Sequence, residues 1–356
     1  MDRPDPNTLD PNTPDPNALD KTALGPYLET NVPGFSGLET IEKFNSGQSN
    51  PTYLLHAKSG RYVLRAKPPG ELLKSAHQVD REFRVMKALK GTKVPVPDVL
   101  LLAPEDSAIG RMFFVMGFLD GRIFWDPSLP ELPGNAERAA IYDAMNATLA
   151  ALHDIDIVKA GLADFGRPGS YFERQLSRWS SQYRASETGT VADMDRLIAW
   201  LEKHLPPDDG IVSLVHGDYR MDNMIFAQDG PKILAVLDWE LSTLGHPYAD
   251  LAYQCMQWRL PHTSGFKGLG GIDRAAIGLP SEQEYVERYC ERRGISGIGN
   301  WTFYLAFSFF RLAAICQGVY KRALDGNASN PEKARTYGEA VTLLAGLAVE
   351  RIDGGE

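Results

Sequence analysis

Four polar residues lie beside two short apolar runs in the segment LVHGDYRMDNMIFAQDGPKILAVLDWE, which is residues 214–240. They are His216, Asp218, Asn223 and Asp238. Polar side chains next to buried strands are costly unless they are paired or bind a ligand. This segment is therefore the first candidate for a reaction site.

The two apolar runs of this segment predict a β-hairpin. Residues 224–226 and 232–237 have strand length and flank the strong turn signal QDGP. Pairing of these strands would bring Asn223 beside Asp238, and an amide oxygen with a carboxylate suits Mg²⁺. Asp218, on the loop that enters the same mouth, could accept a proton from a hydroxyl during phosphoryl transfer. The alternative is a set of loop turns that these side chains cap.

The spacing of these residues matches a known catalytic pattern. His-x-Asp-x-x-x-x-Asn, followed by an aspartate that ends a later strand, is typical of protein kinases. His-Gly-Asp replaces their His-Arg-Asp, and Asp-Trp-Glu replaces their Asp-Phe-Gly. The chain resembles the aminoglycoside phosphotransferase family, whose relatives include choline kinases and homoserine kinases. It is most similar to the branch associated with acyl-CoA dehydrogenases (family members ten and eleven), in residues 46–53, 62–70, 76–89 and 161–179.

The resemblance implies a role for each motif residue, with ATP as the phosphoryl donor and Mg²⁺ as the metal. Asp218 would be the catalytic base, and Asn223 and Asp238 would bind Mg²⁺. His216 would be structural. Asp250, in the stretch HPYADLAY, would brace the catalytic loop, and its alternative is an ordinary acid in the first turn of a helix.

The basic residue that anchors the phosphates is expected on the strand predicted for residues 61–67. Strand alternation puts Val63, Arg65 and Lys67 on one face. The family register selects Arg65, which can hold phosphate oxygens in bidentate fashion, and Lys67 is the alternative. Glu82, in the middle of a predicted helix, would orient Arg65.

Two backbone segments are expected to complete the ATP site. The loop residues that would cover the phosphates through backbone N–H groups are Ser46, Gly47, Gln48, Ser49 and Asn50. This loop lacks the glycine pattern of protein kinases, and the chain has no Walker A motif. The adenine would bind the hinge through Gly117 C=O and Leu119 N–H. The preference between ATP and GTP stays open.

The resemblance implies that the phosphate acceptor is a small molecule with a hydroxyl group, and basic residues of the larger lobe indicate its charge. Arg174 and Arg178 are four residues apart and share a helix face, and Arg259 follows the stretch QCMQW. Such residues suit an anionic acceptor better than a polycation, and the resemblance to the branch associated with acyl-CoA dehydrogenases implies a hydroxyacyl-CoA. The alternative is that these arginines form salt bridges within the lobe. An aminoglycoside phosphotransferase and an ATP-binding pseudokinase are the competing functions.

The elements that must position these residues fall into two lobes. Residues 41–67 predict two strands around a turn at Lys58-Ser59-Gly60, and residues 111–124 a buried strand that runs into a turn at Asp120-Gly121. Residues 72–91 predict an amphipathic helix, with apolar residues at helical spacing at Ala76, Val79, Phe83, Met86 and Leu89. Later helices are predicted at residues 135–153, 170–185, 191–204, 282–293, 300–324 and 331–350.

We therefore expect an α+β fold of the bilobal protein-kinase type. A small antiparallel-sheet lobe would occupy residues 23–118, and a larger, mainly helical lobe residues 119–356. Residues 1–22 contain Asp-Pro-Asn three times, which predicts a flexible Pro/Asn-rich arm.

Composition excludes several classes of protein. A net charge of −9 without a basic run argues against a nucleic-acid partner. The sequence has no uninterrupted apolar run of about 18 residues and has a polar start, so we expect neither a membrane span nor a signal peptide. A cytoplasmic location is expected, and the oligomeric state stays open. Cys255, Cys290 and Cys316 are scattered, which favours small core residues over disulfides or zinc ligands.

Overall fold

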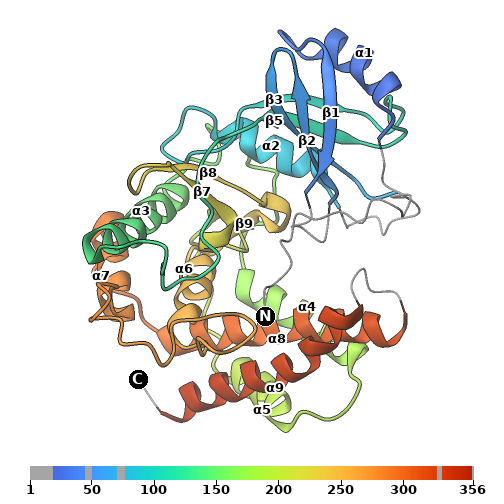
Figure 1. Ribbon diagram of the computed structural model, residues 1–356. Coiled ribbons are helices and arrows are strands. Elements are labelled where there is room, and N and C mark those ends of the chain that lie inside the picture. Colours follow the sequence, from blue (N-terminus) through green and yellow to red (C-terminus); the bar gives the residue numbers. More distant parts are fainter. Residues whose placement is uncertain (1–18, 45–49, 70–76, 327–330, 355–356) are drawn as a thin grey trace, which may run out of the picture. The chain divides into compact units, whose positions relative to one another are not determined.

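The computed structural model describes residues 19–44, 50–69, 77–326 and 331–354. The chain forms two compact units (Figure 1). The first unit contains Met1–Gly121 and Leu234–Glu240, and the second contains Arg122–Ile233 and Leu241–Glu356. The predicted boundary after residue 118 did not anticipate the return of residues 234–240 to the first unit. That return depends on contacts far apart in sequence, such as the Val236 N–H that donates to Pro95 O at 2.9 Å.

The sequence did not predict the first helix. Helix α1 (Lys21–Asn31) starts inside the arm predicted for residues 1–22, of which residues 1–18 lie outside the described part of the chain. The Asp20 side chain caps this helix by accepting a hydrogen bond from Thr22 N–H at 2.8 Å. An N-terminal cap of this kind satisfies a backbone donor that would otherwise lack a partner, so the arm cannot extend to residue 22.

The first unit contains a five-stranded antiparallel sheet with the order β1-β2-β3-β5-β4. Its strands are β1 (Leu38–Lys43), β2 (Thr52–Ala57), β3 (Gly60–Ala66), β4 (Val99–Ala103) and β5 (Phe113–Gly117). The predicted hairpin around Gly60 is confirmed, because β2 and β3 pair directly. The sequence did not predict β1 as a strand of its own. This strand has one buried residue, Leu38, among mostly exposed ones.

Helices cover both faces of this sheet. On one face, Leu24 and Leu28 of α1 share a buried cluster with Leu64 and Ala66 of β3. Helix α2 (Val79–Leu89) packs on β4 and β5. The predicted alternation in β3 is confirmed, since Leu64, Ala66 and the partly buried Tyr62 contribute to this cluster, whereas Arg65 faces the other way and contacts Glu82 of α2. The first residues of the helix predicted at 72–91 lie outside the described residues.

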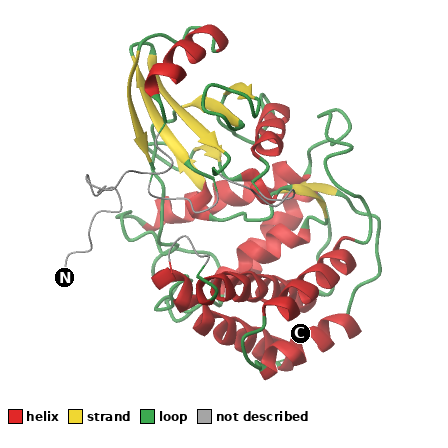
Figure 2. Cartoon of the chain, turned by 90° about the vertical axis from the view of Figure 1, so that its right-hand side faces the viewer, coloured by secondary structure: helices red, strands yellow, loops and turns green. Residues whose placement is uncertain are grey.

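Helices dominate the second unit (Figure 2). They are α3 (Asn135–His153), α4 (Tyr171–Ser186), α5 (Ala192–Lys203), α6 (Tyr248–Cys255), α7 (Glu282–Arg293), α8 (Trp301–Leu324) and α9 (Pro331–Asp353). Single-turn 3₁₀ helices span Met221–Asn223, Trp239–Leu241 and Met256–Trp258. The structure confirms all six helices predicted beyond residue 135, and adds α6. Helix α7 begins with a capping box between Ser281 and Glu284.

Helix α8 is the central helix of the second unit and packs against α4, α6 and α9. By length and composition it could cross a membrane, but 83% of its most apolar window is buried inside the protein. It therefore has the burial of a core helix. The three cysteines are free and buried, as the sequence predicted.

Short strands position the candidate site. In the second unit, β6 (Ser213–Val215) pairs with β9 (Thr243–Gly245), and the His-Gly-Asp loop follows β6. The predicted turn follows β7 (Met224–Phe226) and precedes β8 (Ile233–Val236). This turn is closed by the Ala227 N–H, which donates to Lys232 O at 2.8 Å.

Candidate functional site

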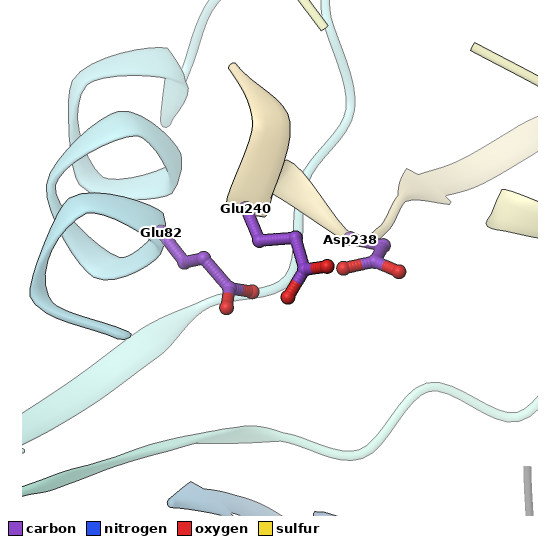
Figure 3. Close-up of side chains that lie close together, drawn as sticks. All are labelled: Glu82, Asp238 and Glu240. Atoms are coloured by element: carbon purple, nitrogen blue, oxygen red, sulfur yellow. The ribbon is translucent and has the colours of Figure 1, made fainter. Parts of the chain in front are cut away.

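Three carboxylates of the first unit, those of Glu82, Asp238 and Glu240, lie close together (Figure 3), and Arg65 lies near all three. Arg65 Nε lies 3.0 Å from Glu82 Oε2, and its Nη2 lies 2.7 Å from Asp238 Oδ1 and 3.7 Å from Glu240 Oε2. The sequence indicated Glu82 and Asp238 but not Glu240. Oxygen atoms of the three acids lie within 4.8 Å of one another. Such a set of hard oxygen donors can hold a divalent cation such as Mg²⁺.

The charges of this cluster are unbalanced. Burial raises the pKa of Glu82 to about 7, assisted by Asp238 and Glu240, although the Arg65 guanidinium acts in the opposite direction. Burial lowers the pKa of Arg65, but the three carboxylates outweigh it and raise that pKa. One guanidinium thus faces three acids, and a bound cation would offset the excess negative charge.

Asn50 contributes its side chain to the same cluster. It is 1% exposed, and its Nδ2 donates to Glu82 Oε1 at 3.0 Å and to Glu240 Oε2 at 3.3 Å. A phosphate contact through the Asn50 backbone stays a prediction. Residues 46–49, which were predicted to share that role, lie outside the described residues.

Two further observations concern residues of the first unit that were predicted to bind the nucleotide. Lys67, the alternative phosphate anchor, forms an ion pair with Glu105, so the Arg65 side chain is the one that reaches Glu82. At the predicted hinge, Gly117 N–H donates to Asp98 O at 2.9 Å. Within the described residues, Leu119 N–H has no protein acceptor, which leaves it available to a ligand.

The backbone of the catalytic loop, in the second unit, is held by one buried carboxylate. Asp250, 1% exposed, accepts hydrogen bonds from His216 N–H at 2.6 Å and Gly217 N–H at 2.8 Å. This is the contact that a bracing role requires. Gly217 has φ +85°, and a Cβ there would lie 2.6 Å from Leu241 O. The tight loop therefore excludes every residue with a side chain at this position.

Asp218 lies at the end of this loop among hydrogen-bond donors. Asn223 Nδ2 donates to Asp218 O at 2.9 Å and to its Oδ2 at 3.0 Å. Burial raises the pKa of Asp218, but Arg220, a hydrogen bond from Tyr253, His216 and Arg311 together hold it below its usual value. The carboxylate is therefore ionised at neutral pH, the form that accepts a proton.

The metal-binding residues predicted by the hairpin belong to different units. Asn223 lies in the second unit and Asp238 in the first, so their convergence on one cation stays a prediction. The Asn223 amide nitrogen is used by Asp218, which leaves its oxygen as the atom available to a cation. Asp238 has φ +62°, an uncommon backbone conformation for a residue with a side chain.

The predicted acceptor residues are not brought together as a group of three. Arg174 and Arg178 line one cavity of about 580 Å³ along α4. The Arg174 guanidinium also donates to Arg167 O at 2.6 Å. Arg259 forms an ion pair with Glu282, which is the interaction within the lobe that the sequence offered as the alternative.

Comparison with known proteins places this site in a family. The family model described as "Phosphotransferase enzyme family" matches residues 40–285. The chain belongs to this family. Mouse acyl-CoA dehydrogenase family member 10 is 48% identical over 88% of the chain and 29% of its own length. Rat acyl-CoA dehydrogenase family member 11 is 45% identical over 92% of the chain and 43% of its own length. The phosphotransferase thus spans less than half the length of both relatives.

Solved structures agree with the predicted fold class. A candidate aminoglycoside phosphotransferase from Ralstonia eutropha has 45% identity and a TM-score of 0.85, over 95% of this phosphotransferase and 100% of that chain. A thermostable mutant of aminoglycoside phosphotransferase APH(4)-Ia, solved as a ternary complex with AMP-PNP and hygromycin B, has 15% identity and a TM-score of 0.59, over 94% and 99% of the chains. At this low identity the second likeness concerns the fold alone. The predicted family and fold class are confirmed.

Sequence reasoning missed three residues of the phosphotransferase that contact predicted site residues. Glu240 is the third residue of Asp-Trp-Glu, and Arg220 follows Asp218 by two positions, so both lay inside motifs already recognised. Tyr253 is three residues after Asp250 in α6, which puts both on one helix face. That spacing could have indicated Tyr253 before the structure was known.

Proposed function

We propose that this phosphotransferase transfers the γ-phosphoryl group of ATP, in a Mg²⁺-dependent reaction, to a hydroxyl of a small molecule, and that the acceptor is a hydroxyacyl-CoA. The observation that carries the proposal is the loop containing Asp218. Asp250 fixes its backbone, and Asn223 and Tyr253 bind the carboxylate. An ionised carboxylate held in a rigid loop is suited to one task, the removal of a proton from a positioned hydroxyl.

In the proposed reaction, Asp218 accepts the proton of the acceptor hydroxyl. The hydroxyl oxygen then forms a bond to the γ-phosphorus while the bond to the β,γ-bridging oxygen breaks, and ADP leaves. Arg65, held by Glu82 at 3.0 Å, would bind phosphate oxygens of ATP. Asn223 and Asp238 would hold Mg²⁺, which supplies positive charge to the phosphates when bound.

Two lines support an acyl-CoA acceptor. The relatives with 48% and 45% identity carry the name acyl-CoA dehydrogenase family member, so the similar segment of each occurs in a protein named for acyl-CoA chemistry. In addition, the cavity along α4 is lined by Arg174 and Arg178, and basic residues favour an anionic acceptor over a polycation. A cytoplasmic location belongs to the same proposal.

An aminoglycoside acceptor is the second candidate. It is favoured by the 45% identity to the Ralstonia eutropha candidate aminoglycoside phosphotransferase. Glu173, beside Arg174, also lines the cavity, but the arginines outnumber it. The two candidates therefore differ in the sign of the charge that the acceptor carries.

ADP release in the presence of ATP and Mg²⁺ tests both candidates. The acceptor panel contains hydroxyacyl-CoAs of several chain lengths, a kanamycin-type aminoglycoside, choline and homoserine. Turnover with a hydroxyacyl-CoA that is lost after addition of EDTA supports the proposal. Turnover with the aminoglycoside and with no other compound of the panel would show that the acceptor is an aminoglycoside instead of a hydroxyacyl-CoA.

The Asp218→Asn variant is the negative control for this assay. We expect it to retain ATP binding and to lose turnover, because an amide cannot accept the hydroxyl proton. Turnover at the wild-type rate in this variant would refute the assignment of Asp218 as the base.

A further inference from the structure

Arg311 is a buried cation of the second unit. It lies on α8, is 7% exposed, and packs against two aromatic rings. Its guanidinium carbon lies 5.7 Å from the centre of Trp179 on α4 and 5.6 Å from the centre of Tyr253 on α6. Within the described residues, no carboxylate lies at ion-pair distance from Arg311, and no protein atom accepts a hydrogen bond from it.

The two rings leave the hydrogen-bonding capacity of Arg311 unused. Aromatic faces stabilise a guanidinium from above and below, but its five N–H donors point outward in its plane. Among the described residues, some side-chain nitrogen and oxygen atoms lack both solvent contact and a hydrogen-bond partner, and the nitrogens of Arg311 are not among them. The small opening that remains therefore lies at the donor end of the side chain.

The position of Arg311 relates it to the proposed base. Tyr253, which stacks on Arg311, also gives a hydrogen bond to Asp218. The positive charge of Arg311 acts on Asp218 together with that of Arg220. Arg311 and Asp218 thus share the neighbour Tyr253, which relates the guanidinium to the carboxylate that would bind the acceptor hydroxyl.

A buried charge without a partner destabilises a fold unless a ligand completes it. An apolar side chain of similar length would fill the space beside the two rings at lower cost. The presence of an arginine at this position therefore suggests a function in ligand binding. Its free N–H donors indicate that the ligand carries hydrogen-bond acceptors. Planar N–H pairs match a carboxylate or another acyl oxygen in bidentate geometry.

We propose that Arg311 binds an acyl oxygen of the acceptor, only a few bonds away from the hydroxyl that receives the phosphoryl group. The acceptor class is therefore a hydroxy acid, as the free carboxylate or as a thioester, and polycations are rejected by charge. The inference rests on the proposed function, and it adds the residue that selects the acceptor. Trp179 extends the same site outward, because Arg178 lies 5.3 Å from the centre of its ring.

The test measures binding without turnover. Asp218→Asn protein, saturated with AMP-PNP and Mg²⁺, is titrated in a calorimeter with three compounds that share one hydroxylated carbon chain: the acyl-CoA thioester, the free hydroxy acid and the corresponding diol. We expect at least one acyl compound to bind about 10- to 100-fold more tightly than the diol. Adding Arg311→Met should remove that difference, and the two acyl compounds distinguish thioester from carboxylate.

Two variants separate binding from folding. Arg311→Met should keep the melting temperature, because methionine fills the same space beside the two rings and removes no ion pair of the described residues, and should leave AMP-PNP affinity unchanged. Arg311→Lys should recover part of the acyl affinity, since the charge stays but the bidentate fork is lost. Arg322→Met is the matched control, because Arg322 is an exposed arginine of the same helix. It should have no effect on any of these quantities.

Three results would overturn the inference: no binding of either acyl compound, equal affinity for the diol, or acyl affinity unchanged in Arg311→Met. Failure of the proposed function looks different. If acyl compounds bind through Arg311 but the unmodified chain transfers no phosphate to them, only the reaction is wrong. If phosphate transfer to an acceptor is insensitive to Arg311→Met, the reaction stands and the inference falls.

Discussion

The charge imbalance around Arg65 predicts an unusual pH dependence of stability, which Glu82→Gln should remove. Burial and the neighbouring acids Asp238 and Glu240 raise the pKa of Glu82 from 4.5 to about 7. In the unfolded chain this carboxyl has its ordinary pKa. Between these two values the folded protein binds a proton that the unfolded chain has released. The free energy of unfolding therefore falls as pH rises through this window.

The size of the effect follows from the two pKa values. The full difference corresponds to about 3 kcal/mol, since one pKa unit is about 1.4 kcal/mol. Between pH 5 and pH 7 the two titration curves predict a loss of about 2 kcal/mol. Glutamine cannot ionise in either state and matches the protonated form in shape. The free energy of unfolding of the wild type minus that of Glu82→Gln should thus decrease by about 2 kcal/mol over this range.

Urea unfolding at several pH values between 5 and 8, without nucleotide or metal, measures this difference. The subtraction removes groups that titrate equally in both proteins, including the buried histidines. Glu105→Gln is the matched control: its side-chain hydrogen bond with Lys67 lowers the pKa of Glu105, so its difference curve should be flat above pH 5. A flat or rising curve for Glu82→Gln would refute the reasoning, because Arg65 would then keep Glu82 ionised throughout.

Further predictions concern the catalytic loop and the phosphate anchor. Gly217→Ala should lower the free energy of unfolding by clearly more than Gly210→Ala. Gly210 also has a positive φ but open space around it, so its substitution should cost about 1 kcal/mol. Equal losses in urea unfolding would contradict the steric argument. Asp250→Asn should cost about 2 kcal/mol or more, because one of two backbone donors loses its charged acceptor, and an unchanged melting temperature would contradict this. Arg65→Met should raise the KM for ATP about 10- to 100-fold and Lys67→Met should not, and the reverse order in steady-state kinetics would show that Lys67 is the anchor.

The sequence alone determined features that depend on neighbouring residues. Side-chain alternation in β3 placed Leu64 and Arg65 on opposite faces, and Leu64 is buried. The helical periodicity of residues 72–91 selected Ala76, Val79, Phe83, Met86 and Leu89. Of these, Val79, Met86 and Leu89 are buried and Phe83 is partly buried, whereas Ala76 lies outside the described residues. Such patterns are readable because strand and helix geometry repeat over a few residues. The spacing of the His-Gly-Asp and Asp-Trp-Glu motifs also indicated the family correctly.

The sequence failed where local pattern is weak. It assigned residues 21 and 22 to the arm, although α1 begins there with Asp20 as its cap. It also did not separate β1, where only Leu38 is fully covered. An edge strand with little burial lacks the apolar alternation on which the prediction depends.

Only the tertiary structure decided which charged residues are paired. Arg65 and Asp238 are 173 positions apart, and no periodicity connects them. Glu240 joins the same guanidinium, and Arg259 is neutralised by Glu282. Arg311 is left buried against two rings, with no carboxylate of the described residues at ion-pair distance. The physical reason is that the sequence supplies the charges and their local faces, whereas desolvation and pairing depend on which distant elements the folded chain brings into contact.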